Sequence, residues 1–253
     1  MKVAFFGSSS LTSSVSEALN KDFNLIKSFT NPETEIKKGE LEELEPDLFV
    51  VASFGKILPK EIINIPKYGS LNIHPSLLPN YRGPSPIQTA ILNGDKNTGV
   101  TIIKMDEEID HGPILFQKEE VIQTDDTFLT LYERLFKIGA DNLTDTINNY
   151  INDNLQIASQ NHSEATFTKL LKKANGQIDI HNPPPKEKLE RMIRAFYPWP
   201  GVFFKGKLGG AERIVKLLPD NQIQVEGKKS MSYKDFINGY AEAGKILSKL
   251  GLA

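Results

Sequence analysis

Residues 70–83 read Ser-Leu-Asn-Ile-His-Pro-Ser-Leu-Leu-Pro-Asn-Tyr-Arg-Gly. The first five alternate apolar Leu71 and Ile73 with polar Asn72 and His74, which is the period of a strand with one face on the core. Pro75 ends that strand because proline has no N–H to donate to a neighbouring strand. Asn72 and His74 therefore project from the same face, with their Cα atoms roughly 6.6–7 Å apart. A polar pair at the end of a strand is typical of a ligand site in an open α/β sheet.

The sequence on both sides of this strand predicts an α/β fold. Short apolar runs that alternate with polar, helix-forming segments are the pattern of a largely parallel sheet. Strands are expected at residues 2–6, 23–30, 48–52, 98–105 and 114–122, and a long amphipathic helix at 127–151. A serine-rich turn at residues 7–10 is expected to lead into the first helix, with a serine as its cap.

Composition restricts the class of protein. The 253 residues are 39% hydrophobic and 25% charged, which is ordinary for a globular chain with a buried core. Because there is no cysteine, disulfides, thiolate metal sites and a cysteine nucleophile are excluded. No apolar run approaches the length of a membrane span, and the first residues enter a strand without a signal-peptide pattern, so a cytoplasmic location is expected.

Charge is divided unevenly along the chain although its net value is only −2. Residues 1–164 hold 14 Lys and Arg against 24 Asp and Glu, whereas residues 165–253 hold 16 against 8. An acidic first part followed by a basic second part favours contact between the second part and phosphate groups. A solvated lysine-rich surface is the alternative interpretation.

Two further segments carry candidate site residues. Residues 53–59 follow the expected third strand and read Ser-Phe-Gly-Lys-Ile-Leu-Pro. The acidic loop at residues 106–114 follows a later strand and contains Asp110 and Gly112. Glycine there permits a backbone conformation that an active-site loop requires.

The run from Asn72 to Gly83 resembles the signature of the folate-dependent formyltransferase family almost position by position. The acidic loop resembles the family's Met-Asp-x-x-x-Asp-x-Gly-x-Ile element, which makes Asp110 the third member of a catalytic trio. The resemblance implies a Rossmann-like, open, mostly parallel sheet. It also implies that Asn72 donates to the oxyanion of formyl transfer, that protonated His74 adds a second donor, and that Asp110 keeps His74 charged and relays a proton.

The same resemblance implies the donor and its pocket. The donor would be 10-formyltetrahydrofolate, a co-substrate, in a flat apolar slot with a few fixed backbone groups. The expected binding residues are Phe54, Gly55, Ile57, Leu58, Ser76, Leu77, Leu78 and Pro79. No metal is expected, because the chemistry needs none and the four histidines lack ligand spacing.

The carboxy-terminal part resembles the methionyl-tRNA branch of this family at residues 194–201 and 227–240. The expected domains are a catalytic domain at 1–158, a linker at 159–185, and an abbreviated, β-rich tRNA-binding-like domain at 186–253. The partner implied is aminoacylated initiator tRNA, contacted through the C-terminal region and linker residues such as Lys169, Lys172 and Lys173. A basic loop usual in that branch is shortened here to residues 31–40, with Lys37 and Lys38 as a remnant.

The resemblance thus implies formyl transfer to the amino group of methionyl-tRNA in translation initiation. A sugar-nucleotide N-formyltransferase with the same donor is the main alternative, favoured by the shortened loop and opposed by the basic C-terminal part. A formyltetrahydrofolate deformylase and a purine-pathway formyltransferase use the same trio but do not explain residues 183–253. A non-catalytic tRNA-binding module is a further alternative, opposed by the presence of the whole trio. The oligomeric state is not determined by the sequence.

Overall fold

The computed structural model describes residues 1–8 and 11–252 of the chain. Part of the expected serine-rich turn, Ser9 and Ser10, lies outside the described residues. The chain forms two compact units. The first comprises residues 1–86, 96–121 and 131–169, and the second comprises residues 87–95, 122–130 and those from 170 onward.

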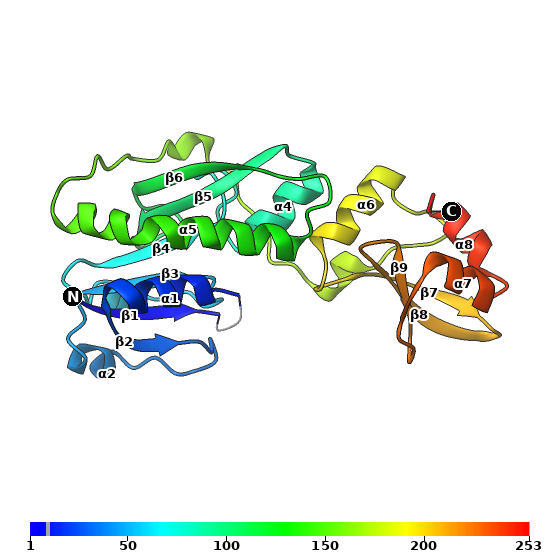
Figure 1. Ribbon diagram of the computed structural model, residues 1–253, viewed down its shortest axis with the longest axis horizontal. Helices are drawn as coiled ribbons and strands as arrows, with labels where there is room; N and C mark the ends of the chain where they lie inside the picture. Colours follow the sequence, from blue (N-terminus) through cyan, green and yellow to red (C-terminus); the bar gives the residue numbers. More distant parts are fainter. Residues whose placement is uncertain (9–10, 253) are drawn as a thin grey trace. The chain divides into compact units, whose positions relative to one another are not determined.

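The first unit is built on a six-stranded sheet with the order β2-β1-β3-β4-β5-β6 (Figure 1). The strands are β1 (Lys2–Gly7), β2 (Asn24–Phe29), β3 (Leu48–Ala52), β4 (Ser70–His74), β5 (Asn97–Lys104) and β6 (Ile114–Val121). The pairs from β2 to β4 are parallel, whereas β5 runs antiparallel to both β4 and β6. The expected α/β, Rossmann-like class is confirmed.

Helices cover both faces of this sheet. They are α1 (Ser13–Asp22), α2 (Lys38–Glu43), α3 (Lys60–Ile63) and the long α5 (Phe128–Ile151), whose first turn belongs to the second unit. Figure 1 draws α1 and α5 across the same face. Gly139 of α5 lies so close to β4 that a Cβ there would stand 2.8 Å from the Cγ2 of Ile73. In the described part of the chain, no helix is both long enough and apolar enough to cross a bilayer.

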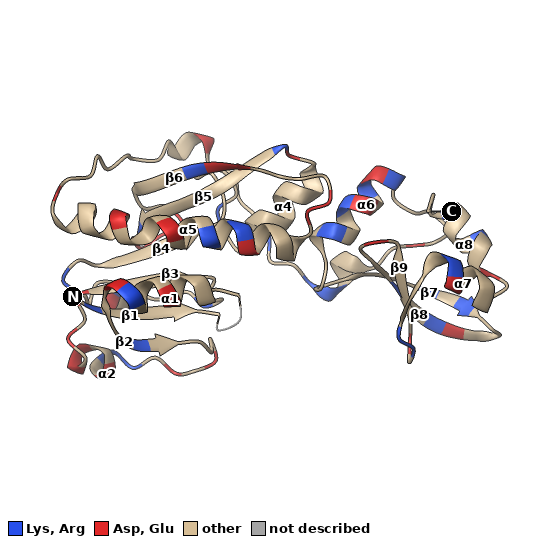
Figure 2. Ribbon diagram, in the orientation of Figure 1, with Lys and Arg blue, Asp and Glu red and all other residues tan. Residues whose placement is uncertain are grey.

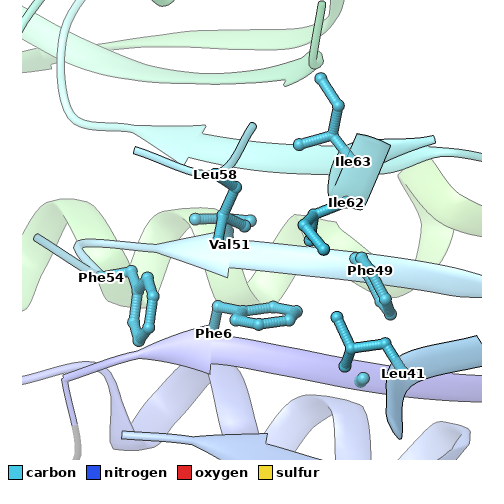
Figure 3. Packing of buried hydrophobic residues seen from close by; sticks show 9 residues of the cluster. Phe6, Leu41, Phe49, Val51, Phe54, Leu58, Ile62 and Ile63 are labelled. Atoms are coloured by element: carbon cyan, nitrogen blue, oxygen red, sulfur yellow. The ribbon is translucent and has the colours of Figure 1, made fainter. Parts of the chain in front are cut away.

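The opposite face carries a hydrophobic cluster. Phe6, Phe49 and Val51 project from β1 and β3, and the ring of Phe6 meets Phe49 edge-on at 5.1 Å (Figure 3). The other members of the cluster are Ala4, Leu41, Phe54, Leu58, Ile62 and Ile63. Val51 is the register partner of Asn72, and neighbours in a ladder share a face, so Asn72 and His74 project on the side of this cluster.

Strand β4 is more deeply buried than a strand with one covered face would be. Leu71 and Ile73 are buried as expected, but Ser70 and His74 are buried too, and only Asn72 is half-buried. The reason is that β4 lies between β3 and β5 and is covered on one side by α5 and on the other by loops. Its two polar side chains are therefore held among protein groups rather than in open solvent.

The second unit contains a four-stranded antiparallel sheet, in the order β10-β9-β8-β7. Its elements are α4 (Pro86–Asn93), α6 (Lys186–Ala195), β7 (Val202–Leu208), β8 (Ala211–Leu218), β9 (Gln222–Val225), β10 (Ser230–Ser232), α7 (Tyr233–Gly239) and α8 (Ala243–Lys249). Pro86, the first residue of α4, belongs to the first unit. Within this unit Arg191 donates to the carbonyl of Leu92 at 3.0 Å, and Arg194 donates to that of Asp126 at 2.8 Å. The expected small, β-rich C-terminal part is confirmed.

Charge on helix α6 of the second unit is mixed. Figure 2 shows basic and acidic residues alternating along α6 rather than a face of one sign. The excess of positive charge is spread over several elements: α6 has four basic and two acidic residues, β7 and β8 together have four basic and one acidic, and α8 has two lysines. The basic character predicted from composition is therefore distributed over α6, the sheet and the closing helix.

Candidate active site

Asn72, His74 and Asp110 meet on one face of the six-stranded sheet. The amide nitrogen Nδ2 of Asn72 donates to Oδ1 of Asp110 at 3.1 Å. The ring nitrogen Nδ1 of His74 lies 3.4 Å from the same oxygen. Side chains separated by 38 and 36 positions in the sequence thus share a single carboxylate oxygen.

Both ring nitrogens of His74 face oxygen atoms. Nε2 lies 2.9 Å from the carbonyl oxygen of Tyr81, and Nδ1 faces the carboxylate of Asp110. A carbonyl oxygen only accepts hydrogen bonds, so Nε2 carries a hydrogen in this arrangement. Only the doubly protonated ring donates at both positions, and the site accommodates that form. Neither nitrogen is directed at a separate oxyanion position, whereas the amide of Asn72 has a second N–H beyond the one that binds Asp110.

Asp110 reaches the trio by a route that the sequence did not indicate. Because β5 is antiparallel to β4, its end lies beside the start of β4, and the N–H of Met105 donates to the carbonyl of Ser70 at 2.8 Å. The loop that follows then folds back over the face of the sheet to bring Asp110 to Asn72. The site is consequently assembled over a sheet face and not at an edge shared by two parallel strand ends.

The conformation of the acidic loop depends on two residues. Asp110 itself has a φ of 51°, in the left-handed region that few residues other than glycine adopt. A Cβ on Gly112 would lie only 1.8 Å from the carbonyl oxygen of Lys104, so a side chain has no room there. Glycine is thus needed at position 112 for close backbone approach, while the unusual dihedral angle falls on the aspartate.

The loop after β4 supplies a further contact to the carboxylate. The N–H of Gly83 donates to Oδ2 of Asp110 at 2.8 Å. Gly83 has a φ of 102°, and a Cβ on it would stand 3.0 Å from Oγ1 of Thr168. Both oxygens of Asp110 are therefore engaged by protein donors, one by Asn72 and one by Gly83.

The same loop is held down by buried hydroxyl and amide groups. Thr101 of β5 donates through Oγ1 to the carbonyl of Ser76 at 2.6 Å and accepts from the N–H of Leu78 at 3.2 Å. Gln117 of β6 donates to the carbonyl of Leu78 at 2.9 Å. Thr101 and Gln117 were not identified from the sequence, because nothing local marks them as partners of a loop more than twenty residues away.

The predicted donor-pocket residues fall into two groups. Phe54 and Leu58 are buried in the hydrophobic cluster, and Ser76 and Leu78 are buried in the loop after β4. In contrast, Ile57 is 73% exposed, Gly55 is exposed with a φ of 79°, and Leu77 and Pro79 are half-buried. The surface offered to a ligand by this set is therefore Ile57, backbone around Gly55, and the partly exposed Leu77 and Pro79.

Metal ligation finds no support in the residues that the structure describes. Among them, no group of three or more His, Cys, Asp or Glu side chains is arranged to hold a metal ion. His111 and His162 stack with ring centroids 3.8 Å apart, but they contact Asp106 and Arg82 respectively. These histidines belong to a hydrogen-bonded network around the acidic loop.

Comparison with protein families and curated sequences gives one consistent result. Residues 1–147 match the family described as formyl transferase. A methionyl-tRNA formyltransferase of Roseiflexus sp. (strain RS-1) is 49% identical over 164 residues, covering 65% of this chain and 50% of the relative. One of Koribacter versatilis is 38% identical over 230 residues, covering 80% and 73%. The chain thus spans about half the length of the first relative and nearly three quarters of the second.

Solved structures share the fold. A methionyl-tRNA formyltransferase from Clostridium thermocellum matches with a TM-score of 0.70 and 22% identity, covering 92% of this chain and 99% of that one. A sugar N-formyltransferase from Shewanella sp. matches with a TM-score of 0.68 and 25% identity, covering 87% and 98%. HypX from Aquifex aeolicus in complex with tetrahydrofolic acid matches with a TM-score of 0.69 and 16% identity, covering 99% of this chain and 47% of that one.

Proposed function

The chain belongs to the formyl transferase family, and from that premise we propose that it moves the formyl group of 10-formyltetrahydrofolate to the amino group of methionyl-tRNA. The observation that carries the proposal is the convergence of an amide, an imidazole and a carboxylate, with Asp110 Oδ1 3.1 Å from Asn72 and 3.4 Å from His74. The proposal implies a cytoplasmic protein that serves translation initiation.

The reaction requires charge stabilisation and one proton transfer. A C–N bond forms between the attacking amine and the formyl carbon, and the bond between that carbon and the donor nitrogen breaks. The second N–H of Asn72 would donate to the oxygen on which negative charge develops. Asp110 would take the proton that the amine loses and return it, directly or through water, to the leaving nitrogen.

His74 has a different role in this scheme from a second oxyanion donor. Its Nε2 is engaged by the carbonyl of Tyr81 at 2.9 Å, and its Nδ1 faces Asp110. A charged imidazole in that position would hold the carboxylate in place and compensate its charge. We therefore assign His74 to Asp110, and the oxyanion to Asn72.

The donor pocket would combine the exposed side chain of Ile57 with backbone around Gly55 and the partly exposed Leu77 and Pro79. These groups suit a flat heterocycle, which needs an apolar contact and fixed backbone donors and acceptors. A fold relative holds tetrahydrofolic acid, which supports a folate in this family of structures. Phe54 and Leu58 would support the pocket from the core rather than touch the ligand.

The tRNA assignment rests on the curated relatives and on charge. A hollow on the second unit is lined by Lys205, Lys207, Lys245 and Lys249 beside Glu212 and Glu242. Four lysines around one hollow suit phosphate groups of a nucleic-acid backbone. The rival acceptor is an amino-sugar nucleotide, favoured by the sugar N-formyltransferase among the solved structures and by the short segment at residues 31–40.

The decisive experiment supplies purified protein and 10-formyltetrahydrofolate with either charged initiator tRNA or a panel of amino-sugar nucleotides. We expect formyl-methionyl-tRNA as the product and no formylated sugar. Asp110→Asn serves as the strongly impaired control, because it keeps the size of the side chain but removes its charge and one of its two acceptor oxygens. Formylation of a sugar and not of the tRNA would overturn the acceptor, and tRNA binding without any formyl transfer would indicate a non-catalytic module.

A further inference from the structure

A buried pair of polar side chains lies behind the acidic loop, outside the trio. Gln160 is 5% exposed and Arg82 is 3% exposed. The amide nitrogen Nε2 of Gln160 donates to the carbonyl of Asp110 at 2.9 Å and to that of Gly112 at 2.7 Å. The side chain of Gln160 thus binds the backbone carbonyls of Asp110 and Gly112, the residues on either side of His111.

The orientation of the Gln160 amide is set by its partners. Its oxygen accepts from Nε of Arg82 at 3.2 Å and from a terminal guanidinium nitrogen at 2.7 Å. A guanidinium has only donors, so the amide oxygen must face it, and the amide nitrogen then faces the two carbonyls, which only accept. Arg82 therefore determines which end of Gln160 reaches the loop.

The loop needs such support because of its dihedral angles. Asp110 has a φ of 51°, and a residue with a side chain holds this conformation only where surrounding contacts impose it. The carbonyl of Asp110 is the group that Gln160 binds, and rotation about the Cα–C bond, the dihedral angle ψ, sets the orientation of that carbonyl relative to the Asp110 side chain. Loss of the Gln160 contact would let the peptide rotate and carry the carboxylate away from Asn72.

Arg82 is itself fixed from several directions. Its N–H donates to the carbonyl of Thr166 at 2.9 Å, and its carbonyl accepts from the N–H of Thr168 at 2.8 Å. Its guanidinium also lies 2.8 Å from Nδ1 of His162, whose ring stacks on that of His111. The pair is thereby anchored to a segment that follows α5, independently of the trio.

We propose that Gln160 and Arg82 are positioning residues, which hold the Asp110 backbone so that its carboxylate lies between Asn72 and His74. The inference deepens the formyl transfer proposed above and rests on it for its kinetic consequences. Neither residue touches the reacting atoms in this scheme. Their effect on catalysis passes through the geometry of Asp110 alone.

The kinetic test uses Gln160→Met, which keeps the length of the side chain and removes its donor. We expect kcat for formyl transfer to fall about 10²-fold, because displacement of a reacting group by roughly 1 Å has that effect, with the KM for the donor little changed. The same substitution in an Asp110→Asn background should lower kcat little further. The matched control is Gln156→Met, an exposed glutamine in the same segment, with kcat unchanged.

A second readout does not depend on activity. The N–H of Gly83 donates to Oδ2 of Asp110, so its hydrogen exchange reports where the carboxylate lies. In Gln160→Met the Gly83 amide should exchange faster, whereas the amide of Leu78, which donates to Thr101, should keep its rate. If Gln160→Met does not fold, Gln160→Glu retains an oxygen that faces Arg82 and replaces the donor with a charged oxygen that cannot donate to the two carbonyls, and the same two measurements apply.

Three outcomes separate the proposals. Equal loss of kcat in the wild-type and Asp110→Asn backgrounds would overturn the positioning role, because the effect would then pass through another group. Unchanged exchange at Gly83 in a folded Gln160 variant would overturn it as well. If the wild-type protein transferred formyl to no acceptor, the proposed function would fail, and the exchange rate at Gly83 would still decide whether Gln160 positions Asp110.

Discussion

The acidic loop after β5 and the segment after β3 flank the same face of the sheet, but they are built differently. In the acidic loop, the carboxylate of Asp110 turns inward and receives hydrogen bonds from Asn72 and Gly83, while Glu107 and Glu108 are exposed. In residues 53–59, Phe54 and Leu58 turn into the core, while Ile57 is 73% exposed. The acidic loop is organised by contacts of Asp110 within the protein, whereas residues 53–59 leave the side chain of Ile57 exposed, where we propose that the donor binds.

From this difference we expect the acidic loop to serve catalysis and residues 53–59 to serve donor binding. Electrostatic catalysis requires donors and charges that are already oriented, since reorienting them during the reaction has a free-energy cost. Binding of a flat heterocycle needs an apolar surface and free backbone groups, which rigid core residues support from behind. Substitutions in the loop should therefore act on rate, and those in the segment should act on stability or on donor binding.

The largest effect is expected from Asn72→Ala. The substitution removes the proposed oxyanion donor, and loss of one such donor typically lowers kcat about 10²–10³-fold. Single-turnover kinetics with saturating donor would measure it, with circular dichroism to check the fold. Asn148→Ala, an exposed position on α5, is the matched control and should retain full activity. A near-normal rate for Asn72→Ala would contradict the proposal that Asn72, held by Asp110 of the acidic loop, is the oxyanion donor.

An intermediate effect is expected from Leu58→Ala. Leu58 is 6% exposed and belongs to the hydrophobic cluster, so its truncation should lower the free energy of unfolding by about 2 kcal/mol, near the low end for buried leucines. Urea denaturation measures the change. Ile57→Ala is the comparison: we expect its stability to stay within about 0.5 kcal/mol of wild type and its KM for the donor to rise. Equal destabilisation by the two substitutions would remove the distinction between core and ligand surface in this segment.

The smallest effect concerns Tyr132, which contacts residues 53–59 at Ser53, and it appears only at high pH. Tyr132 of α5 contacts Ser53, and burial raises the pKa of its phenol above the ordinary value of 10.0, with the Ser53 hydrogen bond opposing that shift. The phenol of the unfolded chain ionises near pH 10.0, while that of the native state stays protonated to higher pH. In this range the native state binds more protons than the unfolded state, so the free energy of unfolding falls as pH rises.

The measurement compares wild type with Tyr132→Phe by urea denaturation from about pH 7 to about pH 11. The difference in stability should be constant up to about pH 9 and should then move in favour of Tyr132→Phe. A parallel pH dependence in both proteins throughout that range would show that the Tyr132 hydroxyl is not shielded from solvent in the native state.

Much of the fold follows from local sequence pattern. The six strands of the first sheet and the long helix α5 lie within a few residues of the ranges that apolar periodicity predicts, because alternation and helical spacing are properties of neighbouring residues. The shared face of Asn72 and His74 follows in the same way, from their separation by two positions on one strand. The family resemblance added Asp110, which no local pattern identifies as a partner of that pair.

The sequence by itself thus determined the class of fold, the order of the elements and the residues that could carry the chemistry. Only the tertiary structure decided that β5 turns antiparallel, that the acidic loop folds back over the sheet, and that Gln160 and Arg82 fix its backbone. The physical reason is the separation along the sequence over which each effect acts, because propensity and periodicity depend on residues only a few positions apart. Strand register, positive φ and buried hydrogen bonds across 78 positions are selected by the packing of the whole unit.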